Sequence, residues 1–496
     1  MDYGLLLATS HASHPERMSG QRRLYESLRA AILDGRLAPG ARLTASRVLA
    51  AELGMARNSV LYAYERLASE GYIAGDRHGT SVARLGLSSR RLANLLAADR
   101  AATAPGLSRR AAGLGREDPH SGEMLPFVPG VPALDAFPLA RWRRSIERAW
   151  RSLSARHLGQ GQAAGQPALR HAIAEYLRVA RGVRCEAAQV FVTAGTQSGL
   201  DLCARLLADA GDTAWVEDPG YPGAHAAFRS ASLRLESIPV DADGLAPPAG
   251  HWQRVPPRLV YITPSHQYPL GSVLSLERRL ALLAAARAAG AWIIEDDYDS
   301  EFRRDGMPVP AVQGLEADAP VIYLGTFSKT LFPALRLGFM VVPPQLATLL
   351  AGTVGAIPQG GHVAEQLALA EFLDSGAFTS HLRRMRRLYA QRRDALQDAL
   401  ARHLGTRLTV SASAGGMHLS ARLEMPLADT TVSAAAAARG LALRPLSRYL
   451  LPGTPQAQYN GFVFGYANVA EDAVDSAVCR LARVLDEVAG ARPGPG

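Results

Sequence analysis

The stretch YLGTFSKTLFPALRLGF, residues 323–339, contains the only lysine of the chain, Lys329. Arginine stays protonated and forms salt bridges at least as well as lysine. It cannot lose a proton near neutral pH and add to an aldehyde as a free amine. The lone lysine is therefore a candidate Schiff-base residue, and a chance survivor of an arginine-favouring composition is the alternative. A phosphate-binding P-loop fits less well, because no glycine stands before the lysine at the spacing of GxxxxGK.

Length and composition indicate a large protein with more than one domain. The chain has 496 residues, of which 48% are hydrophobic, enough for two or three domains. No apolar run approaches the roughly 20 residues that cross a bilayer, so we expect a cytoplasmic protein without a membrane partner. The three cysteines are far apart, which argues against a disulfide framework and a zinc site. Most of the net charge of +9 lies in the first 120 residues and suggests an anionic partner there.

A Schiff-base lysine is convincing only if the rest of a pyridoxal phosphate site is present. The cofactor needs a carboxylate for its pyridinium nitrogen, donors for its phosphate and a flat group over its ring. The run AWIIEDDYDSEF predicts a buried strand that ends in acids, with Asp296 at its carboxyl end. A magnesium site is the competing interpretation of these acids, and Lys329 makes it the weaker one. EDPGYPG offers Tyr221 as the stacking ring.

Donors for a phosphate are predicted at a helix N-terminus. VTAGTQSGLDL predicts a strand, a tight turn at Gly195 and a helix that begins with Thr196 and Gln197. Free backbone N–H groups and the helix dipole make such an end suitable for an anion. Thr326 offers a further hydroxyl, and Arg336, seven residues after the lysine, offers a positive charge.

The distribution of apolar runs predicts an α/β fold after an N-terminal part. Runs such as QVFVTAG, RLVYITP and VIYLGTF recur with Ala/Leu/Arg helices between them. Short, continuously apolar strands separated by helices are typical of a parallel sheet that is covered on both faces. Residues 85–120 lack aromatic side chains and are rich in Ala, Arg, Gly and Ser, which predicts a linker, partly helical around residues 90–100.

The first 84 residues predict three helices followed by a hairpin. QRRLYESLRAAILDGRL has one apolar face, and TASRVLAAELG predicts a short helix with Thr44 or Ser46 as its cap. ARNSVLYAYERLASEGYI predicts a third helix with polar residues at its start, which is helix-turn-helix patterning, although an ordinary three-helix bundle has the same periodicity. GYIAGDRHGTSVARL then predicts a strand, a turn and a second strand, the shape of a basic wing.

This part of the chain resembles the winged helix of the GntR family of bacterial repressors. The motif is matched by LAPGARLTASRVLAAELGMARNSVLYAYERLASEGYI and by the glycine of the wing. Leu61 departs from it, because some members have another arginine there, so base specificity does not transfer. The resemblance implies that phosphates and base edges of double-stranded DNA are contacted by Arg47, Arg57, Asn58 and Ser59, and the minor groove by His78 and Gly79.

The remainder resembles the fold-type I aminotransferases, and the whole chain resembles the MocR subfamily of GntR regulators. The strings that carry the resemblance include FVPGVPALDAFPLARWRR, EDPGYPG, TPSHQYPLG, IIEDDYDSEFRRDG and GTFSKTLFPALRLGF. It implies a winged helix-turn-helix domain over residues 1–84, a linker over 85–124 and an aminotransferase-like, pyridoxal phosphate-binding domain over 125–496. The large subdomain of the latter would span about residues 165–345, and the rest would form the small subdomain.

Roles for the site residues follow from this resemblance. It implies that Lys329 forms the Schiff base and that Asp296 pairs with the ring nitrogen. Tyr298 would hydrogen-bond the ring hydroxyl, Tyr221 would stack on the ring, and His266 would lie where the family has an asparagine loop. The phosphate would be bound by Thr196, Gln197, Thr326, Ser328 and Arg336.

One departure from the aminotransferases bears on activity. These enzymes hold the substrate carboxylate with an arginine near the C-terminus, where the strand NGFVFGYAN has Val463. We therefore expect a ligand-responsive transcription regulator with at most residual transaminase activity. A working aminotransferase with an N-terminal DNA-binding extension is the alternative.

The resemblance also implies a head-to-tail homodimer and an effector. An amino acid, an amine or pyridoxal phosphate itself are open as the effector, with Arg444 and Arg448 as possible contacts. The target genes, the operator and the direction of regulation do not follow from the sequence.

Overall fold

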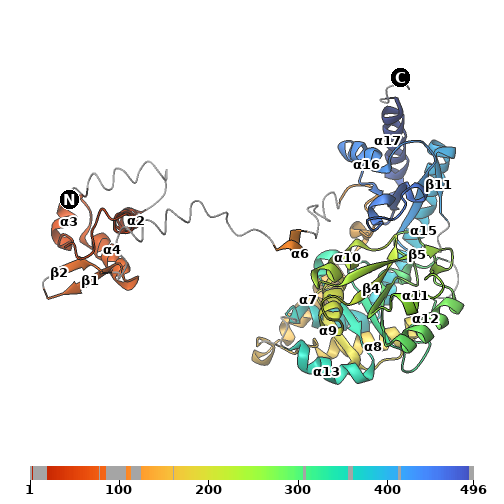
Figure 1. Cartoon of the computed structure of the whole chain (residues 1–496), viewed down its shortest axis with the longest axis horizontal. Helices are drawn as coiled ribbons and strands as arrows, with labels where there is room; N and C mark the ends of the chain where they lie inside the picture. Colours follow the sequence, from red (N-terminus) through yellow and green to blue (C-terminus); the bar gives the residue numbers. More distant parts are fainter. Residues whose placement is uncertain are drawn as a thin grey trace. The chain divides into compact units, whose positions relative to one another are not determined.

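The computed structural model describes Tyr3 and residues 19–77, 79–84, 108–112, 124–159, 161–304, 309–355, 361–411 and 415–490. It divides into two compact units, Met1–Leu107 and Ser108–Gly496, whose elements can be followed in Figure 1. The helix predicted around residues 90–100 lies outside the described residues. No helix in the described ranges combines the length and the apolar character that a membrane span requires.

The first unit has the predicted three helices and hairpin. They are α2 (Gly20–Leu33), α3 (Ser46–Glu52), α4 (Arg57–Ser69), β1 (Ile73–Asp76) and β2 (Gly79–Val82). The apolar faces of the helices meet in one core, in which Leu28, Leu49 and Leu67 are fully buried. The hairpin is antiparallel, with Ile73 opposite Val82.

The predicted cap of α3 is wrong. The residue before the helix is Ala45, in extended conformation, and neither Thr44 nor Ser46 caps the helix with its side chain. The backbone of Thr44 is held instead by tertiary contacts, because its carbonyl accepts a hydrogen bond from Tyr64 Oη at 2.7 Å. A local capping signal was overridden by packing against α4.

The second unit contains an eight-stranded sheet. Its strands are β3 (Val190–Thr193), β4 (Thr213–Asp218), β5 (Arg234–Asp241), β6 (Gly244–Leu245), β7 (Leu259–Ile262), β8 (Trp292–Asp297), β9 (Val321–Thr326) and β10 (Gly338–Val341). Their order is β3-β10-β9-β8-β7-β4-β5-β6. The expectation of a purely parallel sheet is corrected at two strands, since β10 runs antiparallel to β3 and β9, and β6 antiparallel to β5. The connection from β9 to β10 contains no crossover helix, and short connections of this kind join antiparallel neighbours.

Helices cover both faces of this sheet, as the apolar strands predicted. They are α7 (Leu139–Ser152), α8 (Pro167–Arg181), α9 (Thr196–Leu207), α10 (Pro222–Ser230), α11 (His251–Arg254), α12 (Leu276–Ala289), α13 (Pro344–Val354) and α14 (Val363–Asp374). The short helix α6 (Arg109–Ala112) precedes them in the chain. Neighbouring residues of a strand point to opposite faces. Thus Ile294 of β8 packs in one core with α9 and α10, whereas Ile293 packs in another with α12.

A second, antiparallel sheet follows in the chain. It is formed by β11 (Leu408–Val410), β12 (His418–Leu423), β13 (Arg444–Pro445) and β14 (Gly461–Gly465), in the order β11-β12-β14-β13. The helices of this part are α15 (Ala377–Leu404), α16 (Asp429–Ala438) and α17 (Glu471–Gly490). One continuous core joins this sheet to β3, β10, α8 and α14, so the two sheets belong to one folded body.

Candidate functional site

The predicted cofactor residues lie at one edge of the eight-stranded sheet. Strands β4, β7, β8 and β9 are parallel, and β3 points the same way because β10 runs antiparallel to both β3 and β9. Their carboxyl ends therefore meet, which is where open α/β sheets bind ligands. This edge has Thr196 and Gln197 after β3, Tyr221 after β4, His266 after β7, Asp296 and Tyr298 at the end of β8, Thr326, Ser328 and Lys329 at the end of β9, and Arg336 before β10.

Lys329 points at the segment that precedes η1 (Leu134–Ala136). Its Nζ donates a hydrogen bond to the carbonyl oxygen of Gly130 at 2.7 Å. Gly130 has a φ of +76°, and a Cβ at this position would lie 2.8 Å from the lysine Nζ. The positive φ favours glycine here, and a side chain would in addition displace the end of the lysine. Gly130 lies in the run FVPGVPALDAFPLARWRR, where no local pattern marks its contact with the lysine.

Asp296 offers a buried acceptor that the described residues leave unused. The residue is 4% exposed, and its Oδ2 accepts a hydrogen bond from Tyr261 Oη at 2.8 Å. Its Oδ1 has no partner among the described residues. Burial raises the pKa of this carboxyl to about 7. A pyridinium N–H would satisfy Oδ1 and pair a positive charge with the carboxylate, so the residue fits the ring nitrogen of pyridoxal phosphate.

The start of α9 fits a phosphate. Gly195 precedes the helix with a φ of +88°, and the buried hydroxyl of Thr196 has no partner among the described residues. Gln197 Nε2 donates to the carbonyl of Gly223 at 2.9 Å, which ties this helix end to α10. A Cβ on Gly338 would lie 2.9 Å from Gly195 Cα, so the start of β10 packs directly on the turn. An orphaned hydroxyl at a helix N-terminus is a site that an anion would complete.

Thr326, Ser328 and Arg336 are the other residues predicted to bind the phosphate. Thr326 Oγ1 accepts a hydrogen bond from the backbone N–H of Ser328 at 3.1 Å. Arg336 is exposed and adopts a left-handed backbone conformation with a φ of +50°.

Aromatic side chains form one wall of the site. The rings of Tyr221 and Tyr268 meet edge to face with centroids 5.9 Å apart, and those of Tyr268 and Tyr298 with centroids 5.8 Å apart. Tyr268 Oη lies 3.0 Å from Tyr449 Oη. The expected stacking residue, Tyr221, is thus held by neighbouring rings at a fixed angle. Tyr268 and Tyr449 were not predicted as part of the site.

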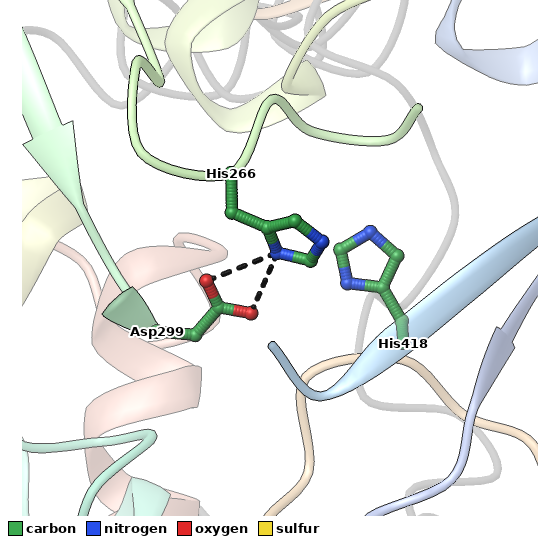
Figure 2. Close-up of side chains that lie close together, drawn as sticks. All are labelled: His266, Asp299 and His418. Carbon is green, nitrogen blue, oxygen red and sulfur yellow. Dashed lines mark hydrogen bonds and ion pairs between the residues drawn. The ribbon is translucent and has the colours of Figure 1, made fainter. Parts of the chain in front are cut away.

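His266, Asp299 and His418 form a buried cluster, in which His266 is hydrogen-bonded to Asp299 and its ring lies 4.7 Å, centroid to centroid, from that of His418 (Figure 2). Its Nδ1 lies 3.0 Å from Asp299 Oδ2 and 3.1 Å from Tyr298 Oη, and Tyr298 Oη donates to the His266 carbonyl at 2.8 Å. His418 Nε2 lies 3.2 Å from the carbonyl of Pro269 and must donate to it, which leaves Nδ1 as an acceptor. Burial lowers the pKa of His418 well below its ordinary value and favours this neutral form.

The cluster joins the two sheets of the second unit. His266 and Asp299 follow strands of the eight-stranded sheet, whereas His418 begins β12 of the four-stranded sheet (Figure 2). Asp299 Oδ2 also accepts a hydrogen bond from the Met417 N–H at 3.1 Å. A Cβ on Gly416 would come within 2.2 Å of His266 Cε1, so the close contact requires glycine there.

The residue types of this cluster are also those that bind metals. Ligand atoms of His266, Asp299 and His418 lie within 4.8 Å of one another. The His266 and Asp299 atoms are already hydrogen-bonded to each other, so the pair is satisfied as it stands. The arrangement fixes the orientation of Tyr298, the residue expected to reach the ring hydroxyl.

Val463, the residue expected at the position of the carboxylate-binding arginine of aminotransferases, is fully buried in β14. On the neighbouring strand β13, Arg444 is paired with it in register. The site therefore has an arginine one strand away from the expected position. From the sequence, Arg444 was expected only as a possible contact of the effector.

The predicted DNA-binding side chains lie on α3, α4 and the hairpin. Arg47 is exposed on α3, and Arg57 and Asn58 are exposed in the first turn of α4. Ser59 is half-buried beside them, and Gly79 is exposed at the start of β2 with a φ of +127°. His78 lies outside the described residues.

The winged helix is typical of a DNA-binding regulator. The sheet edge that follows has a lone lysine, a buried acid and a helix N-terminus suited to a phosphate. Together they define a DNA-binding regulator with a pyridoxal phosphate-binding, fold-type I domain. Residues 21–82 match the model of the bacterial regulatory proteins of the gntR family, and residues 130–470 match that of aminotransferase class I and II. The chain belongs to the GntR family, and within it to the transcriptional regulators of the MocR type.

Relatives match nearly the whole chain. A protein of Rhizobium meliloti named "Probable rhizopine catabolism regulatory protein MocR" is 43% identical over 454 residues, 90% of each chain. The pyridoxine biosynthesis transcriptional regulator PdxR of Corynebacterium glutamicum is 35% identical over 454 residues, 91% of this chain and 92% of its own. The structure of LysN, an α-aminoadipate aminotransferase of Thermus thermophilus, has a TM-score of 0.69 at 27% identity, covering 78% of this chain and 98% of its own.

The buried carboxyl of Asp296 predicts a pH-dependent stability of the cofactor-free protein. Its pKa of about 7 in the folded state lies above the unfolded value of about 4. The folded state therefore holds this proton more tightly than the unfolded state. As the pH rises from ~4 to ~7, the wild type should lose up to about 1.4 kcal/mol of unfolding free energy per pH unit relative to Asp296→Asn, and above pH ~7 the difference should stay constant. Urea unfolding of both proteins across this range measures the difference. Equal pH slopes would show that Asp296 is not a buried, unpaired acid.

Proposed function

We propose that this protein binds operator DNA with its winged helix and senses a small amino compound, or pyridoxal phosphate itself, through its aminotransferase-like domain. The observation that carries the proposal is the position of Lys329. The only lysine of the chain lies at the sheet edge where Asp296 and Thr196 have unused hydrogen-bonding atoms. Chance alone does not place a single amine beside both a buried acid and a helix N-terminus.

The residues of the site would divide the binding of the cofactor among them. Bound pyridoxal phosphate supplies an aldehyde and an electron-withdrawing ring. Lys329 would attach covalently, Asp296 would hold the ring nitrogen, and Tyr298 would hold the ring hydroxyl. The phosphate would be bound by Thr196, Gln197, Thr326, Ser328 and Arg336.

The buried cluster of His266, Asp299 and His418 suggests how a ligand bound at the site would affect the four-stranded sheet. Tyr298 contacts His266, His266 contacts Asp299, and Asp299 accepts the backbone N–H of Met417. This line runs from the cofactor side of the large sheet to the four-stranded sheet. A ligand that moves Tyr298 would therefore disturb the contacts between the two sheets. It can shift the protein between two conformations only if it binds them with different affinities.

A working aminotransferase with an incidental DNA-binding extension is the alternative function. The buried Val463 in place of the carboxylate-binding arginine argues against it, and Arg444 on the neighbouring strand argues for residual binding of a carboxylate. Turnover assays with common amino donors separate the two functions.

We further propose a head-to-tail homodimer in the cytoplasm, where the chromosome lies. Exposed apolar side chains on α7, among them Leu139 at 68% and Trp150 at 59%, offer surface that a second copy could cover. Burying large apolar side chains stabilises an interface.

The first prediction of this proposal concerns DNA. Arg57→Ala should weaken binding to a fragment from the protein's own upstream region by about 1 to 3 kcal/mol if Arg57 makes a bidentate base contact. Arg36→Ala is the control, because Arg36 is exposed and forms an ion pair with Asp34. Electrophoretic mobility shift at several salt concentrations measures both, and affinity should fall steeply with salt. Equal affinities of the two variants would exclude the start of α4 as the reader.

The second prediction concerns Lys329→Arg. The change keeps a positive charge at the sheet edge but removes the nucleophilic amine. We expect a folded variant that binds DNA but lacks the yellow absorption of covalently bound cofactor and does not change its DNA affinity when cofactor and amines are added. A borohydride-reducible linkage in the variant, or a full ligand response, would contradict the role of Lys329.

The third prediction concerns assembly. Light scattering at micromolar concentration should give the mass of two chains, and Trp150→Glu should shift this equilibrium toward one chain because it places a charge in the interface. The control is Val179→Glu, since Val179 is 87% exposed on α8. A monomeric wild type would refute the dimer, and an unaffected Trp150→Glu dimer would exclude α7 from the interface.

A further inference from the structure

A hollow of about 390 Å³ lies between α15 and the short helix η1. It is lined by Asp135, Ala136, Arg384, Arg387, Leu388, Gln391 and Arg392. Three of these side chains are arginines and only one is acidic. The volume is in the range of small-molecule sites, which measure roughly 300 to 1,000 Å³. We refer to it as the α15 hollow.

The positive charge of the α15 hollow is only partly neutralised. Arg392 forms an ion pair with Asp135 at 2.9 Å. Arg384 and Arg387 are exposed and have no acidic partner among the residues that the structure describes. They are one turn apart on α15, so both guanidinium groups can face the same ligand. One acid against three arginines leaves a net charge of about +2 in the hollow.

A buried donor lies in the wall of the hollow. The side chain of Arg392 is 5% exposed, and its Nε has no hydrogen-bond partner in the described part of the chain. A buried N–H without a partner is costly, and buried arginines are ordinarily hydrogen-bonded in full. Since Nη2 is paired with Asp135 and Nη1 donates to the carbonyl of Ala467, Nε is the donor that has no acceptor among the described residues.

The hollow is connected to Lys329 by one short segment. Asp135 of η1 is held by Arg392, and the N–H of Ala133 donates to Tyr389 Oη of α15 at 3.0 Å. The same segment begins at Gly130, whose carbonyl accepts the hydrogen bond of Lys329. A ligand that draws Arg392 away from Asp135 would therefore move the segment that contacts the lysine.

We propose that the α15 hollow is a binding site for a small anion with carboxylate or phosphate groups, and that its occupancy is transmitted to Lys329 through residues 130–136. Arg384 and Arg387 bind the anionic groups, and the wall formed by Ala136 and Leu388 contacts a short apolar body. A small ligand fits better than DNA, because the hollow of about 390 Å³ has the size of a small-molecule site and its third arginine, Arg392, is only 5% exposed, where a duplex backbone does not reach. The binding half stands without the proposed function, whereas the transmission to Lys329 rests on it.

The test uses the full chain loaded with pyridoxal phosphate, with succinate and inorganic phosphate as separate probes in calorimetric titrations. Arg387→Gln should weaken binding of the preferred probe about tenfold, the loss of one charge-assisted hydrogen bond. The matched control is Arg383→Gln, which removes the same charge from an exposed position of α15 outside the hollow and should change affinity less than about twofold. The probe that binds tells a carboxylate ligand from a phosphate ligand.

Several outcomes would overturn the site. Equal weakening in both variants would show diffuse attraction of anions to α15, and no binding of either probe at millimolar concentration would show that the hollow takes no such ligand. If Arg387→Gln impaired binding of a non-operator duplex but not of the probes, the hollow would be a nucleic-acid surface.

Transmission to Lys329 has a test of its own. The bound probe should shift the visible absorption of the cofactor in the wild type and not in Asp135→Asn, which lacks the charge that holds Arg392. Binding without that shift would refute the transmission while leaving the proposed DNA-binding function to its own tests.

Discussion

The hydrogen bond from Lys329 to the carbonyl of Gly130 links the edge of the large sheet where the strands have their carboxyl ends to the segment that precedes η1. The acceptor belongs to a glycine with positive φ, and a Cβ at this position would lie 2.8 Å from the amine and displace it. The same segment is held on its other side by Tyr389 and Arg392 of α15. The position of the lysine is thus determined by parts of the chain far from it in sequence.

Burial of unpaired polar atoms is the second constraint on the site. Asp296 and Thr196 each have one atom without a partner among the described residues, and such atoms cost free energy until a ligand satisfies them. By contrast, His266 and Asp299 satisfy each other and connect the two sheets. The site therefore combines atoms reserved for a ligand with a hydrogen-bonded support that is complete without one.

Much of this architecture follows from short-range sequence patterns. Apolar runs that end in Asp296 or Thr326 predict strands whose carboxyl ends carry the site, because parallel strands bring those ends together. The antiparallel β10 was missed, since periodicity does not encode strand direction. The contacts of Gly130, Tyr261 and His418 were missed for another reason: each joins segments remote in sequence, and no local signal marks them. The cap of α3 failed because packing against Tyr64 outweighed a local hydrogen bond.

The first unit has a hydrophobic core of its own: in the part of the chain that the structure describes, the residues around Leu28 and Leu67 that form it all lie between residues 3 and 82. A substitution on the exposed face of α4 therefore leaves the packing within this core unchanged, just as a change at the sheet edge affects packing within the second unit. In evolutionary terms, the choice of operator and the choice of ligand can drift independently. A lineage of such proteins could acquire new target genes without first losing the molecule it responds to.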